Sequence, residues 1–283
     1  MTTKKENAKR LGIYLLIVFA FMLLYILCVK PMNKSNTVYY IIYMIFSFSP
    51  ALASLITRAV TKEGFRDMKL RLHLTDNIRY YLLSFGLPLL CFTAIILLPV
   101  VLSGHSDWLC GFTFSNVLSN AFLLFAFSAV QSIGLLGEEL GWRGYMNQKM
   151  EPLLGTVGTC IAGGIVWGLW HLPMDIAGYL GENGKLTEAL GSTFGRLAML
   201  TCFGAFLMWL TKKTDSVFPA VIAHFMYNES QGAVMSLLAQ GNIPEDASLP
   251  SWTDIVRYFP LLVIAVIFVV LLLRDKKKSI QTA

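Results

Sequence analysis

This sequence has few charged residues. Only 14% of its 283 residues are Asp, Glu, Lys or Arg, whereas soluble domains carry about 25%. Hydrophobic residues make up 55% of the chain, and the mean hydropathy is +0.61. So few charged side chains cannot cover the surface of an ordinary soluble domain. The composition therefore excludes that class and indicates a polytopic membrane protein.

Cysteine patterns and linkers are lacking as well. The five Cys residues form no C-x-x-C pair and no disulfide framework. No long linker, low-complexity tract or internal repeat divides the chain, so we expect one integral membrane domain over residues 1–283. The basic start is followed by about 19 apolar residues without a small-residue cleavage site, which favours an uncleaved first span.

Long apolar runs are what the sequence has instead. A membrane-spanning helix needs roughly 20 apolar residues. The expected fold is all-α, a polytopic helix bundle with a polar cavity inside the membrane. Eight candidate spans emerge, at about 11–29, 37–57, 80–103, 117–138, 153–172, 190–210, 216–240 and 255–273.

Basic residues lie at the ends of these spans rather than in one patch, so nucleic acid is not an expected partner. With a cytoplasmic N-terminus, 18 of the 23 Lys and Arg residues fall on the cytoplasmic side. This asymmetry satisfies the positive-inside rule. We therefore expect a multi-pass protein of the cell membrane with both termini in the cytoplasm.

Three polar clusters interrupt the apolar runs. Ionisable groups inside membrane spans are costly and by default mark a functional site. The clusters are Glu138-Glu139-Leu140-Gly141-Trp142-Arg143, Trp167-Gly168-Leu169-Trp170-His171 and His224-Phe225-Met226-Tyr227-Asn228.

The first cluster holds two acids with different expected roles. On a helix, Glu139 and Arg143 are spaced i, i+4 and can pair. Glu138 is rotated about 100° from Glu139 and stays free of that pair. The alternative is a purely structural ion pair, which needs only one of the two acids. Four small residues of the same helix form a stripe that lets another helix approach closely: Gly134, Gly137, Gly141 and Gly144.

The other two clusters can lie near the first. Residues 151–155 resemble a turn, which would place Glu138 and His171 at similar depth in an antiparallel hairpin. His224 and Asn228 share one helix face. The alternatives are an interfacial histidine at 171 and an interhelical polar clamp at 224 and 228.

Together these groups suit hydrolysis by activated water. A carboxylate beside a histidine can hold and deprotonate water, and a histidine with an amide can stabilise an oxyanion. The clusters contain no Ser or Cys that looks like a nucleophile. As an alternative, Glu138, His171 and His224 could ligate Zn²⁺, although H-E-x-x-H is absent.

These residues resemble the CPBP family, which comprises type II CAAX prenyl endopeptidases and bacterial relatives of the bacteriocin-immunity (Abi) and lysostaphin-resistance-like kinds. The family motifs E-E-x-x-x-R, F-x-x-x-H and H-x-x-x-N match here in order, with Trp167 in place of phenylalanine. The motif region covers about 120–232.

The resemblance implies an intramembrane peptidase with a cytoplasm-open cavity. It assigns water activation to Glu138 and His171, oxyanion stabilisation to His224 and Asn228, and support to Glu139, Arg143 and Trp167, the last as an aromatic wall. Metal dependence stays open.

The same residues are compatible with more than one function. The leading hypothesis is an endopeptidase for a membrane-associated peptide or protein in the lipid bilayer. The alternatives are a non-catalytic peptide-binding or self-immunity protein and a small proton-coupled transporter.

Overall fold

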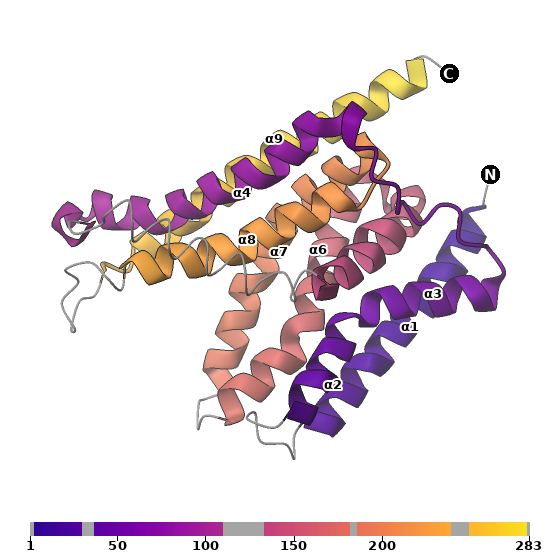
Figure 1. Ribbon diagram of the computed structural model, residues 1–283, viewed down its shortest axis with the longest axis horizontal. Coiled ribbons are helices and arrows are strands. Elements are labelled where there is room, and N and C mark those ends of the chain that lie inside the picture. Colours follow the sequence, from indigo (N-terminus) through magenta and orange to yellow (C-terminus); the bar gives the residue numbers. More distant parts are fainter. Residues whose placement is uncertain (1–2, 30–36, 110–132, 182–185, 239–248, 282–283) are drawn as a thin grey trace.

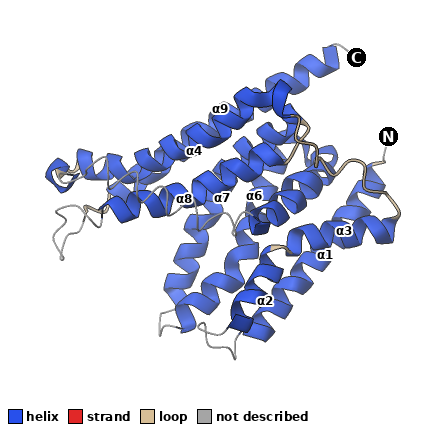
Figure 2. Ribbon diagram, in the orientation of Figure 1, coloured by secondary structure: helices blue, strands red, loops and turns tan. Residues whose placement is uncertain are grey.

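The structure, a computed structural model, describes residues 3–29, 37–109, 133–181, 186–238 and 249–281. Within these residues every regular element is helical and strands are absent, which confirms the all-α prediction (Figure 2). The α-helices are α1 (Lys4–Val29), α2 (Thr37–Ser47), α3 (Ser49–Thr61), α4 (Leu74–Leu102), α6 (Asn147–Gly181), α7 (Leu186–Thr214), α8 (Phe218–Leu238) and α9 (Thr253–Gln281). A 3₁₀ turn, η1 (Ser106–Leu109), follows α4, and a π-helical turn, η2 (Trp142–Met146), continues the helical residues 133–141 into α6.

Five of the described helices are long and apolar enough to cross a membrane, or six if the bent pair α2–α3 counts as one span. The expected number of eight is therefore not confirmed. The proposed span 117–138 lies mostly outside the described residues. The proposed span 216–240 corresponds to α8, which is not among the five. The polar residues of the third cluster lower its hydropathy.

The helices form two groups joined by α6 and α7 (Figure 1). One group is α4, α8 and α9, and the other is α1, α2 and α3. Helix α6 packs on α7 and on α1, and α7 packs on α8 and α9. Outward-facing side chains such as Leu16, Leu23 and Leu27 are more than half exposed, as expected for a lipid-facing surface.

A sharp turn divides α6. Gly155 has φ 70° and ψ 177°, a conformation that a residue with a Cβ rarely adopts. Residues 133–150 and 156–181 therefore form two helical arms that meet at this glycine. The turn expected over 151–155 is thus present, and it brings the first two polar clusters together.

The glycine stripe of the first arm packs against the bend between α2 and α3. These two helices meet at 55° near Phe48. A Cβ added to Gly137 would lie 2.8 Å from the Phe48 Cα, and one added to Gly141 would lie 2.4 Å from the Pro50 carbonyl carbon. The stripe therefore permits the close approach that its spacing predicts, and it fixes the first arm beside a broken helix.

Candidate active site

The pair expected within the first cluster is present. Arg143 Nη1 donates a hydrogen bond to Glu139 Oε1 at 2.9 Å, and both side chains are buried. The same oxygen lies 2.9 Å from His224 Nδ1 on α8. An ionised carboxylate can only accept hydrogen bonds, so Nδ1 carries the proton and Nε2 is left for other partners. Glu139 thus positions His224 as well as Arg143.

Glu138 takes a different partner. Trp167 Nε1, on the second arm, donates a hydrogen bond to Glu138 Oε2 at 2.8 Å. Glu138 lines a cavity and is 5% exposed, whereas Glu139 is fully buried. The two adjacent acids therefore have separate surroundings, as their positions on a helix predict.

Trp167, which belongs to the second cluster, contacts residues of the other two. Besides the bond to Glu138, its ring lies under Arg143, with the guanidinium carbon 4.0 Å from the ring centroid. The ring also meets His224 edge to face at 5.0 Å. A guanidinium over an indole face is an attractive arrangement. Trp167 therefore lies at the centre of the site. The interpretation of this residue as an aromatic wall did not predict these contacts.

The cavity has a volume of about 820 Å³. Glu138, His171, His224 and Asn228 all line it, so the structure brings the four candidate catalytic residues to one space. His171 is partly exposed and packs edge to face on Trp170 at 4.7 Å, and Asn228 is exposed. The other lining residues come from α2, α7 and α9 as well as from the site helices, and include Tyr43, Met44, Met174, Met199, Tyr227 and Tyr258.

A π-helical turn follows the two acids directly. The turn ends at Asn147, whose backbone N–H donates a hydrogen bond to the Trp142 carbonyl oxygen five residues earlier. Such turns occur frequently at functional sites. Nothing in the residue spacing indicated this one. Glu63, outside the turn, helps to hold it by accepting a 2.5 Å hydrogen bond from the Tyr145 hydroxyl.

Residues 107–229 match the family model described as type II CAAX prenyl endopeptidase Rce1-like. The expected resemblance is confirmed. A CAAX prenyl protease 2 from Methanococcus maripaludis is 26% identical over 146 residues, which are 49% of this chain and 52% of that protein. The chain thus spans about half the length of the curated relative it matches.

The segment that matches the family model contains two charged residues that the sequence did not assign to the site. Arg196 lines the cavity and forms a two-pronged ion pair with buried Asp175, with Nη2 to Oδ1 at 2.7 Å and Nε to Oδ2 at 3.3 Å. Thr193 donates a further bond to Asp175. The cost of charge inside a membrane could have identified both residues. Arg196 was instead counted among the external loop charges.

The zinc alternative does not fit the arrangement of the candidate site. Among the described residues, no three His, Cys, Asp or Glu side chains lie close enough together to hold a metal ion. This applies to Glu138, His171 and His224, all of which are described. Nδ1 of His224 faces Glu139 and one oxygen of Glu138 accepts from Trp167.

Proposed function

We propose that this protein is an intramembrane endopeptidase that hydrolyses a peptide bond of a membrane-associated peptide or protein. The observation that carries the proposal is the separation of the two acids. Glu139 neutralises Arg143 and positions His224, while Glu138 faces the cavity and has no ion-pair partner among the described residues. A structural ion pair explains Glu139 but gives no reason for a second buried acid.

In the proposed reaction, Glu138 and His171 hold a water molecule in the cavity. The water oxygen attacks the peptide carbonyl carbon while Glu138 takes a proton from the water. The carbonyl oxygen becomes an oxyanion, which accepts hydrogen bonds from His224 Nε2, when that nitrogen is protonated, and from the Asn228 amide. The C–N bond then breaks as Glu138 returns the proton to the leaving amine.

The cavity suits an apolar or lipid-bearing peptide. Its volume is within the range of small-ligand sites, roughly 300–1,000 Å³. Methionine and tyrosine side chains from several helices form much of its wall, and methionine adapts to irregular apolar shapes. The name of the archaeal relative adds prenylated CAAX peptides to the substrates worth testing. Cleavage rates for matched peptides with and without a prenyl group decide this point.

The test of the proposal is cleavage of a peptide library by the purified protein, wild type against Glu138→Gln. Glutamine keeps the acceptor for the Trp167 N–H but cannot take a proton, so turnover should fall roughly 10²–10⁴-fold. Glu6→Gln is the matched control, because Glu6 is exposed near the N-terminus. Equal turnover in wild type and Glu138→Gln would remove Glu138 from the mechanism. Peptide binding without cleavage by the wild type would favour the non-catalytic alternative.

A further inference from the structure

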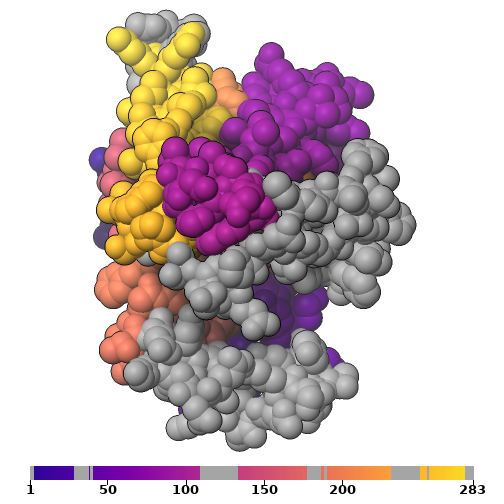
Figure 3. Space-filling view, turned by 90° about the vertical axis from the view of Figure 1, so that its left-hand side faces the viewer, coloured from indigo at the N-terminus to yellow at the C-terminus, as the bar shows by residue number. Residues whose placement is uncertain are grey.

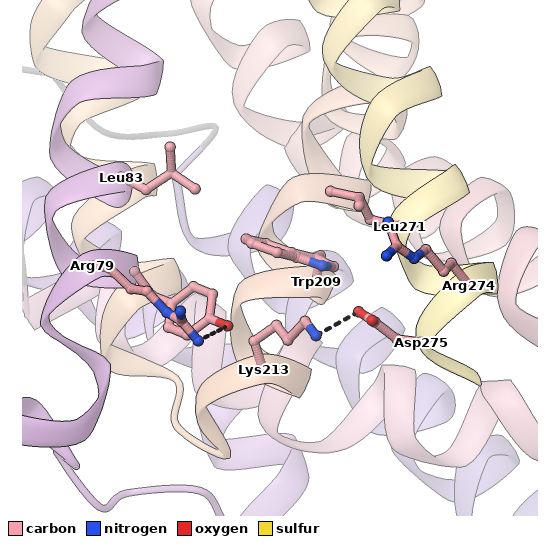
Figure 4. A pocket seen from close by; sticks show the side chains of 8 residues that line it. Arg79, Leu83, Trp209, Lys213, Leu271, Arg274 and Asp275 are labelled. Carbon is pink, nitrogen blue, oxygen red and sulfur yellow. Dashed lines mark hydrogen bonds and ion pairs between the residues drawn. The ribbon is translucent and has the colours of Figure 1, made fainter. Parts of the chain in front are cut away.

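A second cavity, lined by other residues than the site, lies at the end of the bundle where α4 begins and α7 and α9 end. Its volume is about 460 Å³. Helices α4 and α9 are in contact along their length, and Figure 3, which views the bundle from the opposite end, shows the magenta end of α4 beside the yellow α9. The residues that line the cavity are Arg79, Tyr80, Leu83, Trp209, Lys213, Leu271, Arg274 and Asp275 (Figure 4).

Positive charge exceeds negative charge in this cavity. Lys213 pairs with Asp275 at 2.9 Å. Arg79 is exposed and bonds only the Tyr80 hydroxyl, at 3.2 Å, among the described residues. Arg274 is also exposed and has no acidic partner in the part of the chain that the structure describes. Two guanidinium groups are therefore available to an anion.

A buried donor without an acceptor lies in the same wall. Trp209 is 8% exposed, and its Nε1 has no hydrogen-bond partner among the described residues. Figure 4 shows the nitrogen-bearing end of the indole turned toward Arg274 and Asp275. A buried N–H without an acceptor costs free energy. An anion oxygen bound beside Arg274 would supply the acceptor after a small side-chain shift.

The position of the cavity along the helices indicates which anion it takes. The candidate spans Leu74–Leu102, Leu190–Thr214 and Ile255–Lys277 all have one end here, so the cavity lies at the boundary between apolar and polar surface. Tyr80 and Trp209 pack edge to face at 5.4 Å, and such aromatic residues favour membrane interfaces. Leu83 and Leu271 extend the wall toward the apolar side.

We propose that this cavity binds the phosphate of an anionic phospholipid headgroup. Arg79 and Arg274 supply the charge, and Trp209 Nε1 supplies a neutral donor. Leu83 and Leu271 contact the first part of an acyl chain. Basic pockets between membrane helices are suited to such headgroups. The apolar wall favours a lipid over free phosphate, and the site is independent of the proposed peptidase activity.

The experiment is a titration of the purified full-length protein in neutral detergent with phosphatidylglycerol or phosphatidylcholine, followed by native mass spectrometry. The wild type should bind phosphatidylglycerol more tightly. Arg79→Gln with Arg274→Gln should weaken phosphatidylglycerol binding roughly 30-fold, because each basic contact is worth about 1 kcal/mol. Phosphatidylcholine binding should change little. Both side chains are exposed, so the variant should fold.

The matched control is Arg66→Gln with Arg71→Gln, which removes the same charge from exposed positions before α4. Its affinity for phosphatidylglycerol should stay within about twofold of wild type. The proposed site would be contradicted if the Arg79/Arg274 variant bound phosphatidylglycerol as tightly as wild type, or if the control lost as much affinity for this lipid. Inorganic phosphate that binds as tightly as the lipid would overturn the assignment to a phospholipid.

Discussion

At the scale of single residues, Trp167 departs most from its expected role. The family motif has phenylalanine at this position, and an aromatic ring was all the resemblance required. The structure adds an N–H group that bonds Glu138 and a ring face that carries Arg143. Phenylalanine retains a ring face but lacks the donor. In this protein the indole is therefore expected to hold the Glu138 carboxylate in place.

Trp167→Phe should accordingly keep the fold but lower peptide turnover. A hydrogen bond to a charged group contributes about 1.5–3 kcal/mol, so we expect a loss of at least about tenfold in kcat. Trp142→Phe is the control, because Trp142 is also fully buried and its N–H has no partner among the described residues. Turnover that is unchanged in Trp167→Phe would show that the bond has no catalytic role.

The two adjacent acids should differ in what their loss does to stability. Glu139→Ala leaves a buried arginine unpaired and frees His224, at a cost of about 3–5 kcal/mol. Glu138→Gln leaves the hydrogen-bond pattern intact, so its thermal unfolding should match wild type. Unfolding curves of both variants in one detergent measure the difference. Identical curves for the two would contradict the separate roles.

At the scale of elements, the glycine stripe determines how close the first arm comes to the α2–α3 bend. Gly141→Ala places a methyl group against Pro50 backbone atoms, and overpacking of this kind costs about 1–3 kcal/mol. Its midpoint of thermal unfolding should fall. Gly86→Ala, in α4, is the control, because a Cβ there meets nothing within 4 Å. Equal midpoints for the two variants would show that the α2–α3 bend can move to make room for the methyl group without loss of stability.

The π-helical turn depends on the segment between α3 and α4. Glu63 in that segment accepts hydrogen bonds from Tyr145 at 2.5 Å and from Lys149 at 2.6 Å, and pairs with Arg10 at 3.3 Å. Burial alone would raise the pKa of Glu63, but the bonds from Lys149 and Tyr145 and the charge of Arg10 hold this pKa below its ordinary value.

This pKa predicts how stability depends on pH. A lowered pKa in the folded protein stabilises the fold above the ordinary value of 4.5, and that stabilisation is lost as the pH falls through the lowered pKa. Glu63→Gln should therefore be less stable than wild type near neutral pH, and the gap should narrow on acidification. Thermal unfolding at several pH values measures it. A gap that stays constant down to acidic pH would contradict the ion-pair role.

At the scale of the whole molecule, the cavity of the candidate active site and the cavity around Trp209 lie at different levels of the bundle. On α7, the first is lined by residues between Gly191 and Leu200 and the second by Trp209 and Lys213, so the nearest of these residues are roughly 14 Å apart along the helix. If the end with the cavity around Trp209 faces the cytoplasm, as the positive-inside rule predicts, the part of the active-site cavity that Gly191 lines faces the outer side of the membrane. A cytoplasm-open cavity, which the family resemblance implies, requires the opposite orientation.

We predict that the charge-based orientation holds. Reporter fusions after residue 65 or 213 should report the cytoplasm, and fusions after 110 or 185 the outside. Ser192 lies at the wall of the active-site cavity. In a variant without the native cysteines, Ser192→Cys should react from outside with a membrane-impermeant thiol reagent. A cytoplasmic signal from the fusion after 185, or labelling only after permeabilisation, would instead support the cytoplasm-open cavity.

The sequence by itself determined the class of fold and predicted the polar residues that line the candidate site, because apolar length and the cost of buried charge act locally along the chain. Helical spacing was enough to separate Glu138 from Glu139, to pair Glu139 with Arg143 and to align the glycine stripe. The single domain over 1–283 and both cytoplasmic termini stay predictions.

Tertiary structure alone decided the contacts between helices. The shared oxygen of Glu139, the Trp167 bond to Glu138, the Asp175–Arg196 pair and the cavity around Trp209 each join side chains from different helices. The π-helical turn is local in sequence, but Glu63 from another segment helps to hold it. Which partners meet depends on how the helices pack, and the spacing of residues within one helix carries no record of that.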